Sequence, residues 1–231
     1  MSNIVKNTTF PNPLDLIAPH SCRGCGHIGK ALCDRCKNNI ILDHSNFCPN
    51  CKTPSLTGQC PKCKSLPPVF VIGNRSDLIG KLVHDYKYQS TRALSKPLAE
   101  ILHHTLLTIG GPVTIVPLPT IHRHIRERGL DHTYLIAKHL AKFRHYSVQK
   151  LLLRDRNTVQ VGASRKDRLT QAKSAYQINS KVKVNPDTTY ILFDDVWTTG
   201  ASIKAGIKKL RQAGVQKIIV AILAVSRLEQ D

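Results

Sequence analysis

Two adjacent carboxylates followed by a hydroxyl-rich turn form the stretch of this sequence that is richest in chemistry. Residues 190–202 read YILFDDVWTTGAS, an apolar strand that leads into two aspartates and a turn that opens a helix. Free backbone N–H groups and the helix dipole at such a turn attract phosphate. Carboxylates accept hydrogen bonds from vicinal sugar hydroxyls and help to hold Mg²⁺. The stretch therefore predicts a ribose 5-phosphate site, with candidate residues Asp194, Asp195, Val196, Trp197, Thr198, Thr199, Gly200, Ala201 and Ser202.

The alternative interpretation of this stretch is an acidic strand end followed by a threonine helix cap. The order of strand, acid pair, TTG and helix favours the phosphate site instead. The chain contains neither the G-x-x-x-x-G-K of a Walker loop nor the G-x-G-x-x-G of a dinucleotide turn. Trp197 could stack on a ribose or base, or pack beneath the turn.

All eight cysteines lie near one end of the chain, in four C-x-x-C pairs. Two such turns supply four thiolates to one tetrahedral Zn²⁺, which leaves no position for water, so the metal would be structural. A disulfide framework is the alternative, but it requires secretion and no signal peptide is visible. The gap lengths favour two sequential sites over a cross-braced pair. The expected ligands are Cys22, Cys25, Cys33 and Cys36 for one ion and Cys48, Cys51, Cys60 and Cys63 for the other.

The proline pair that follows Leu66 ends the cysteine region and predicts a domain boundary, with residues 1–66 in one domain and 67–231 in another. Beyond it, apolar strand patterns alternate with helical patterns. We expect strands at 69–73, 113–119, 151–153, 188–193 and 217–226, and helices at 76–88, 91–108, 131–143 and 201–214. This alternation predicts an α/β fold with a mostly parallel sheet and helices on both faces. Ligands of such sheets bind beyond the carboxyl ends of the strands.

The charge of the chain points to a negatively charged partner. Its 34 Lys and Arg residues against 15 Asp and Glu give a formal net charge of +19. Nucleic acid or phosphorylated ligands are the first candidates, and a generally basic surface is the alternative. No apolar run approaches the ~20 residues of a membrane-spanning helix. We therefore expect a cytoplasmic protein that does not span a membrane.

The motifs together resemble those of a known family. The stretch at 190–202 is similar to the 5-phosphoribosyl 1-pyrophosphate (PRPP) motif of type I phosphoribosyltransferases. The chain as a whole resembles the ComF family of competence proteins, through IGKLVHDYKY (79–88), VPLPTIHRHIRERG (116–129) and the Arg-rich segment 154–168. The resemblance implies a type I phosphoribosyltransferase-like domain preceded by a double zinc ribbon. The family usually has RGFNQ where this chain has RGLDH, at 128–132.

The resemblance also assigns two basic segments. The loop that follows the 113–119 strand would face pyrophosphate, which guanidinium groups bind bidentately; its candidates are Arg123, Arg126 and Arg128. The segment after residue 153 would be a flap over the site, with candidates Arg154, Gln160 and Arg168. A solvated basic loop is the alternative for both segments. The histidines of the chain are expected to be surface residues.

Three functions remain open from the sequence. The first is a protein that binds PRPP or a nucleotide-like ligand with Mg²⁺ and handles incoming single-stranded DNA in natural competence. The second is an active phosphoribosyltransferase with an unidentified acceptor, and the third is a non-catalytic sensor of PRPP or nucleotides. The catalytic residues stay unknown, because no convincing base-reading element is visible and Thr198 stands where 6-oxopurine enzymes have an aspartate. A protein of the competence machinery could dock on the cysteine-rich head.

Overall fold

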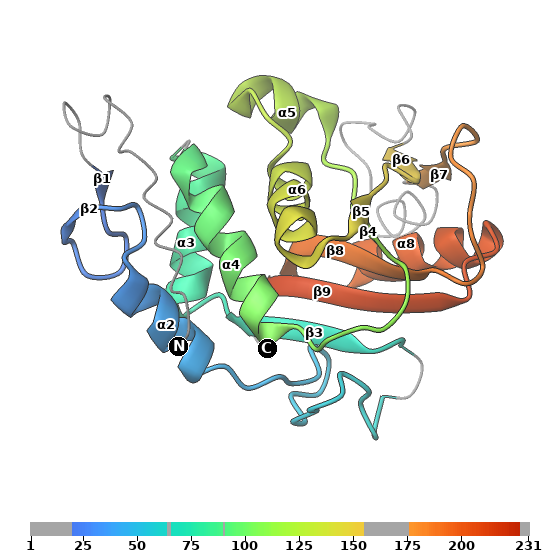
Figure 1. The fold of residues 1–231 in the computed structure, drawn as a ribbon, viewed down its shortest axis with the longest axis horizontal. Helices are drawn as coiled ribbons and strands as arrows, with labels where there is room; N and C mark the ends of the chain where they lie inside the picture. Colours follow the sequence, from blue (N-terminus) through green and yellow to red (C-terminus); the bar gives the residue numbers. More distant parts are fainter. Residues whose placement is uncertain (1–19, 64–65, 90, 155–175, 227–231) are drawn as a thin grey trace, which may run out of the picture.

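A five-stranded sheet, parallel at every pairing, forms the centre of the protein (Figure 1). The computed structural model describes residues 20–63, 66–89, 91–154 and 176–226. The strand order is β3-β9-β8-β4-β5. The bounds are β3 (Val69–Asn74), β4 (Val113–Pro117), β5 (Ser147–Val148), β8 (Thr189–Trp197) and β9 (Lys217–Val225). Because the carboxyl ends of parallel strands meet at one edge, residues that are far apart in the chain converge there.

Helices cover both faces of this sheet. The bounds are α3 (Leu78–Tyr88), α4 (Ser95–Thr105), α5 (His122–Arg128), α6 (His132–Arg144) and α8 (Ala201–Gln212), with a short 3₁₀ turn (Arg92–Leu94) before α4. Side chains of β8 alternate between two cores: Ile191 and Phe193 pack with α4 and α6, whereas Leu192 packs with α8. This alternation is the period of an extended strand that is buried on both sides. The predicted α/β fold class is confirmed.

A small N-terminal unit packs against the helical layer. It contains β1 (His20–Ser21), β2 (Ile28–Gly29) and α2 (Asp34–Leu42), with an isolated bridge between Phe47 and Pro54. Cys22 and Cys36 are buried in the same core as residues of α3 and α4. Lys37 of α2 pairs with Glu100 of α4, with Nζ and Oε2 2.5 Å apart. The unit is therefore anchored to the layer of helices.

A two-stranded antiparallel ribbon stands apart from the main sheet. It pairs β6 (Leu152–Arg154) with β7 (Tyr176–Ile178). The chain between these two strands lies outside the described residues. No helix of the described part is long and apolar enough to cross a membrane.

The structure departs from the expected elements in three places. The basic segment expected as a loop contains α5, whose residues are all exposed or half-buried. An apolar face is absent there, so the periodic signal of a helix is missing, although Arg and Glu are good helix formers. The strand expected at 151–153 pairs with β7 and does not join the main sheet. β8 continues to Trp197 because its residues still pair with β9, as far as Val225.

Candidate functional site

A cleft of about 310 Å³ lies at the carboxyl ends of β8 and β4. α3 forms one wall, and the start of α5 and α6 another. The ribbon β6–β7 and the first turn of α8 complete it. In Figure 1 the carboxyl ends of the sheet strands face α3. The cleft is therefore where the fold class predicts ligand binding.

The two aspartates lie near the carboxyl end of strand β8 and line this cleft. Asp195 is buried, and one of its carboxylate oxygens is 2.8 Å from Nζ of Lys87. The backbone N–H of Asp195 donates to Oδ1 of Asp194, at 2.9 Å. Desolvation of the carboxyl group by the surrounding protein raises the pKa of Asp194 well above its usual range, and the neighbouring Asp195 carboxylate raises it further. The pair thus holds one lysine-bound carboxylate and one carboxyl group that resists ionisation.

The turn after β8 exposes its hydroxyl groups and buries its tryptophan. Thr198 and Ser202 line the cleft, and none of the hydrogen bonds among described residues uses the backbone N–H of Thr198, Thr199 or Gly200. Gly200 has a left-handed backbone, with φ of 72°, and a Cβ there would lie 2.3 Å from the Trp197 ring. Trp197 therefore packs beneath the turn, and of the two interpretations of its role the structure supports this one. Free N–H groups at a helix start suit an anion.

Of the nine motif residues, five contribute to the cleft: Asp194, Asp195, Val196, Thr198 and Ser202. Trp197 and Gly200 are buried beneath the turn, and Ala201 is half-buried. Thr199 is exposed, and its hydroxyl accepts a hydrogen bond from the N–H of Ala201. These four residues shape the turn.

The three arginines expected on the pyrophosphate side separate in the structure. Arg128 lines the cleft, with its guanidinium carbon 4.9 Å from the centre of the Tyr88 ring. Arg123 and Arg126 do not line it; Arg123 is exposed and pairs with Glu127 one helical turn away, at 2.6 Å. The helix causes this separation, because successive residues of α5 point in different directions.

The flap candidates are described only in part. Arg154 lines the cleft and lies 5.7 Å from the ring of Tyr176, another lining residue. Burial raises the pKa of the Tyr176 hydroxyl. Gln160 and Arg168 lie outside the described residues.

The cleft residues that the sequence-based candidates did not include are numerous, and Lys87, Arg75 and His132 are three of them. Lys87 lies in the motif segment 79–88, so its motif was a signal that could have identified it. His132 lies in the segment 128–132, where this chain departs from the family pattern, and Arg75 carried no signal. His132 is buried, with Nε2 2.8 Å from the carbonyl oxygen of Tyr86. Burial lowers its pKa. The expectation that the histidines are surface residues is wrong for His132.

Arg75 is held at the cleft by a tight turn between β3 and α3. Its N–H donates to the carbonyl oxygen of Val225, at 2.8 Å, and the carboxylate of Asp77 accepts from the N–H of Asn74. A Cβ at Gly80 would lie 2.1 Å from the carbonyl oxygen of Arg75. Only glycine therefore lets α3 approach this turn so closely. The result is a cleft with Arg75, Lys87 and Arg128 on its walls.

The cysteines form two separate groups of four, each with all sulfur atoms within 4.8 Å of one another. The groups are Cys22, Cys25, Cys33 and Cys36, and Cys48, Cys51, Cys60 and Cys63. Two of the sulfur–sulfur distances are 3.7 Å and 3.5 Å, and all eight cysteines are free thiols. Four sulfurs about 2.3 Å from one Zn²⁺ would be about 3.8 Å apart, so each group could hold a metal ion. The expected sequential grouping is confirmed, and the disulfide alternative is not.

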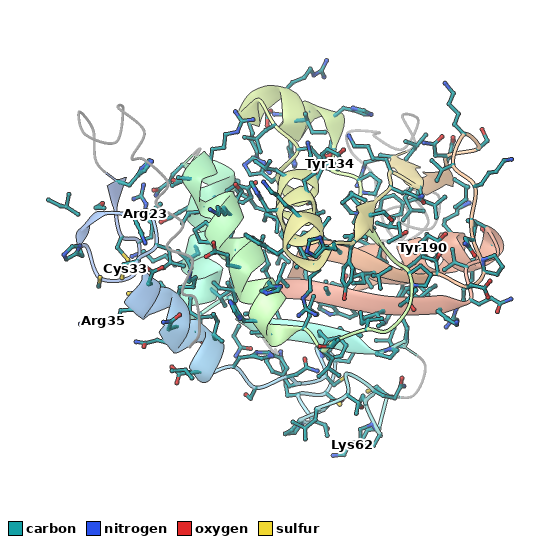
Figure 2. The ribbon with its side chains drawn as sticks, viewed as in Figure 1. Arg23, Cys33, Arg35, Lys62, Tyr134 and Tyr190 are labelled. Atoms are coloured by element: carbon teal, nitrogen blue, oxygen red, sulfur yellow. The ribbon has the colours of Figure 1, made fainter. Side chains whose placement is uncertain are left out.

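The two cysteine groups lie in different parts of the molecule. Figure 2 shows Cys33, which belongs to the first group, beside α2. Lys62, which lies between two cysteines of the second group, is far from Cys33 in the same view. A tight turn brings the first group against α3, since a Cβ at Gly24 would meet both Cys36 and Leu78. Three cysteines of the second group, Cys48, Cys60 and Cys63, line a small cavity together with Leu66 and Val69.

Comparison with known proteins gives one curated relative. Competence protein F of Haemophilus influenzae is 28% identical over 218 residues, which cover 88% of this chain and 94% of that protein. No family model matches the chain. The resemblance to the ComF family indicated by the motifs is confirmed by this relative.

Solved structures give more distant similarities. The allosteric regulatory enzyme of purine biosynthesis is 18% identical and covers 56% of this chain, with a TM-score of 0.37. Glutamine PRPP amidotransferase from B. subtilis is 17% identical, covers 56% and has a TM-score of 0.37. This chain spans about a quarter of the length of each, 24% and 25%. Adenine phosphoribosyltransferase from Saccharomyces cerevisiae is 11% identical, with a TM-score of 0.35 over 83% of this chain and 88% of that one.

Proposed function

We propose that this chain, which resembles the ComF family over most of its length, binds PRPP or another ribose 5-phosphate ligand with Mg²⁺ in the cleft at the end of β8. The observation that carries the proposal is the convergence of two unlike groups. The Asp194–Asp195 pair and the hydroxyl turn open into the same cleft as Lys87 and Arg128. Acceptors for sugar hydroxyls and donors for phosphate are thus present together.

We propose a part of the ligand for each wall of the cleft. The 5-phosphate would lie over the turn at Thr198 and Ser202, where N–H and hydroxyl donors meet the start of α8. The ribose hydroxyls and Mg²⁺ would lie at Asp194 and Asp195. The pyrophosphate would lie toward Arg128, and Lys87, which pairs with Asp195, would add a second cation in the same cleft.

For the biological process, we propose the handling of incoming single-stranded DNA in the cytoplasm during natural competence. The net charge of +19 supports a polyanionic partner. The name of the curated relative, Competence protein F, supports the process. We also propose that the metal in both cysteine groups is Zn²⁺ and that it is structural, because four thiolates leave no open position.

The test of the cleft is calorimetric titration of PRPP with Mg²⁺ into the wild type and into the double variant Asp194→Asn/Asp195→Asn. We expect saturable binding by the wild type and its loss in the double variant, because neutral amides cannot hold Mg²⁺ as carboxylates do. A matched control changes two exposed aspartates, Asp43→Asn/Asp187→Asn, and should bind as the wild type does. A folded, metal-loaded wild type that gives no heat of binding would contradict the proposal.

The same ligand also separates binding from turnover. Pyrophosphate release in the presence of candidate acceptors would identify the chain as a phosphoribosyltransferase. PRPP binding without pyrophosphate release would instead support a role in ligand sensing or positioning.

A further inference from the structure

A row of cations on α8 borders a second groove, distinct from the cleft. Lys204, Lys208 and Arg211 line this groove of about 450 Å³ together with Leu66, Ile207 and Gln212. The cations are spaced four and three residues apart, so they lie on one side of the helix and span about 10.5 Å of its axis. We call Lys204, Lys208 and Arg211 the α8 row.

The α8 row contributes nothing evident to the folded chain. All three side chains are exposed, and none has an acidic partner among the described residues. α8 contains no Asp or Glu, and Lys209 adds a fourth cation to the helix. Like charges one helical turn apart destabilise a helix slightly. The opposite face of α8 buries Ile203 and Leu210, which is enough to hold the helix in place.

We propose that the α8 row is a binding track for the sugar-phosphate backbone of a single-stranded nucleic acid. The inference rests on the proposed DNA-handling function and gives that function a place on the molecule. It is independent of the cleft, because no residue of the α8 row lines the cleft.

The charge of the groove favours a nucleic acid strand over an acidic protein. A nucleic acid strand carries one negative charge per nucleotide, so each of three cations in a row can meet its own phosphate. A single acidic side chain could not pair with all three cations. The excess charge of the whole chain, +19, attracts a partner that is repeatedly charged. Leu66 and Ile207 are only 9% and 5% exposed, so the exposed cations are the groups that a strand would meet. The choice of a single strand over a duplex follows from the proposed DNA-handling function.

The test is the salt dependence of binding to a fluorescein-labelled oligo(dT), followed by anisotropy from about 50 to about 200 mM salt. The variant is Lys204→Gln/Lys208→Gln/Arg211→Gln, since glutamine keeps helix propensity and removes charge. Each lost phosphate contact lowers the slope of log K against log salt by about 0.7 for a single strand. We expect the slope of this variant to be smaller by about 2.

The matched control removes three exposed cations from other helices, Lys81→Gln/Lys96→Gln/Lys142→Gln, and lowers the net charge by the same amount. Its slope of log K against log salt should differ from that of the wild type by less than about 0.7, the value for one phosphate contact. Equal slopes for the two variants would overturn the proposal, because the effect would then reflect net charge alone. An equal loss of duplex binding by the α8 variant would overturn the preference for single strands.

Two further outcomes separate this inference from the proposed cleft. The α8 variant should still bind PRPP as the wild type does, which also shows that it is folded. No binding of oligo(dT) by the wild type would overturn both the α8 track and the DNA-handling role, and would leave the PRPP proposal to its own titration. Unchanged oligo(dT) binding together with weaker binding of poly-glutamate would assign the groove to an acidic protein and overturn the proposal.

Discussion

Tyr86 and His132 each donate a hydrogen bond to the other's backbone carbonyl oxygen. The hydroxyl of Tyr86 donates to the carbonyl of His132 at 3.1 Å, and Nε2 of His132 lies 2.8 Å from the carbonyl of Tyr86. The two rings also meet edge to face, with centres 4.5 Å apart. A carbonyl oxygen only accepts, so Nε2 carries the proton. The two residues join α3 to α6 directly behind the cleft lysine, Lys87.

Removing one half of this link should destabilise the fold without removing the other half. Tyr86→Phe deletes the hydroxyl and leaves the carbonyl oxygen of His132 without that donor, while the bond from Nε2 stays. We expect the free energy of unfolding to fall by about 1–2 kcal/mol. Urea denaturation measures it, with Tyr88→Phe as the control, because Tyr88 is 63% exposed. Equal stability of the two variants would contradict the role given to the link.

The buried imidazole also predicts a dependence of stability on pH. Burial lowers the pKa of His132 in the folded state, and the charges of Arg128 and Lys87 lower it further, against the bond to Tyr86 and the charge of Asp195. The unfolded chain therefore binds the proton more readily. The contribution of His132 to stability is complete above its unfolded pKa of about 6.5 and is lost as the pH falls below that value.

His132→Gln tests this dependence, because glutamine can still donate to the carbonyl of Tyr86 and does not titrate. We expect the free energy of unfolding to fall less between about pH 7.5 and about pH 5.5 in this variant than in the wild type. The control His122→Gln changes an exposed histidine on α5 and should keep the pH dependence of the wild type. A wild-type slope in the His132 variant would show that other groups cause the dependence.

The turn that carries the proposed phosphate site should not tolerate a side chain at Gly200. Gly200→Ala places a Cβ in a left-handed backbone and against the Trp197 ring, so both strain and overlap oppose it. We expect a loss of about 2–4 kcal/mol in stability and weaker PRPP binding. Gly111→Ala is the control, since Gly111 has a similar φ of 77° and no atom near its Cβ position. The difference between the two variants measures the overlap with Trp197, and no difference would contradict the packing described.

The Lys87–Asp195 pair should show energetic coupling. Their side chains are 19% and 7% exposed, so each charge depends on the other. A double-mutant cycle with Lys87→Met and Asp195→Asn should give a coupling energy of about 1–3 kcal/mol. The exposed pair Arg123–Glu127, taken through the same cycle with Arg123→Met and Glu127→Gln, should give no measurable coupling. Equal coupling in the two cycles would mean that the buried pair is not formed in solution.

Metal analysis should find two zinc ions per chain, one in each cysteine group. Cys25→Ser and Cys51→Ser each remove one ligand from a different group. Each variant should retain about one ion, because the two groups share no ligand. Elemental analysis of the purified protein measures this, and a variant that loses both ions would contradict independent sites.

The elements with a strong periodic signal were predictable, and those without one were not. The strands at 69–73 and 113–119 and the α3 pattern appear where expected, because buried apolar residues fix both their period and their position. β1, β2 and β5 are two residues long, which is too short for any period. α5 was missed because Ile125 is its only apolar residue, so it has no apolar face. Composition separates helix from loop poorly when no face is buried.

The candidate site was predictable where its residues belong to one contiguous sequence motif. The aspartates and the turn at 198–202 are contiguous, so the sequence alone brings them together. Arg75 and His132 reach the cleft only through the sheet order, which places the ends of β3 and β4 on either side of β9 and β8. Arg123 and Arg126 were expected at the site because the family resemblance implied a pyrophosphate loop there, and the helix α5 directs them away from the cleft.

α3 has a consequence for the cell's use of trace metals. Its Asp85 lies 3.7 Å from Arg23, next to the first cysteine group, and its Lys87 holds Asp195 in the cleft two residues later. A single helix of 11 residues thus contacts both a turn of the first cysteine group and the acidic pair. If zinc fixes that turn, starvation for zinc would loosen α3 and with it the position of Lys87. The affinity of the cleft for a sugar phosphate would then depend on the zinc supply of the cell.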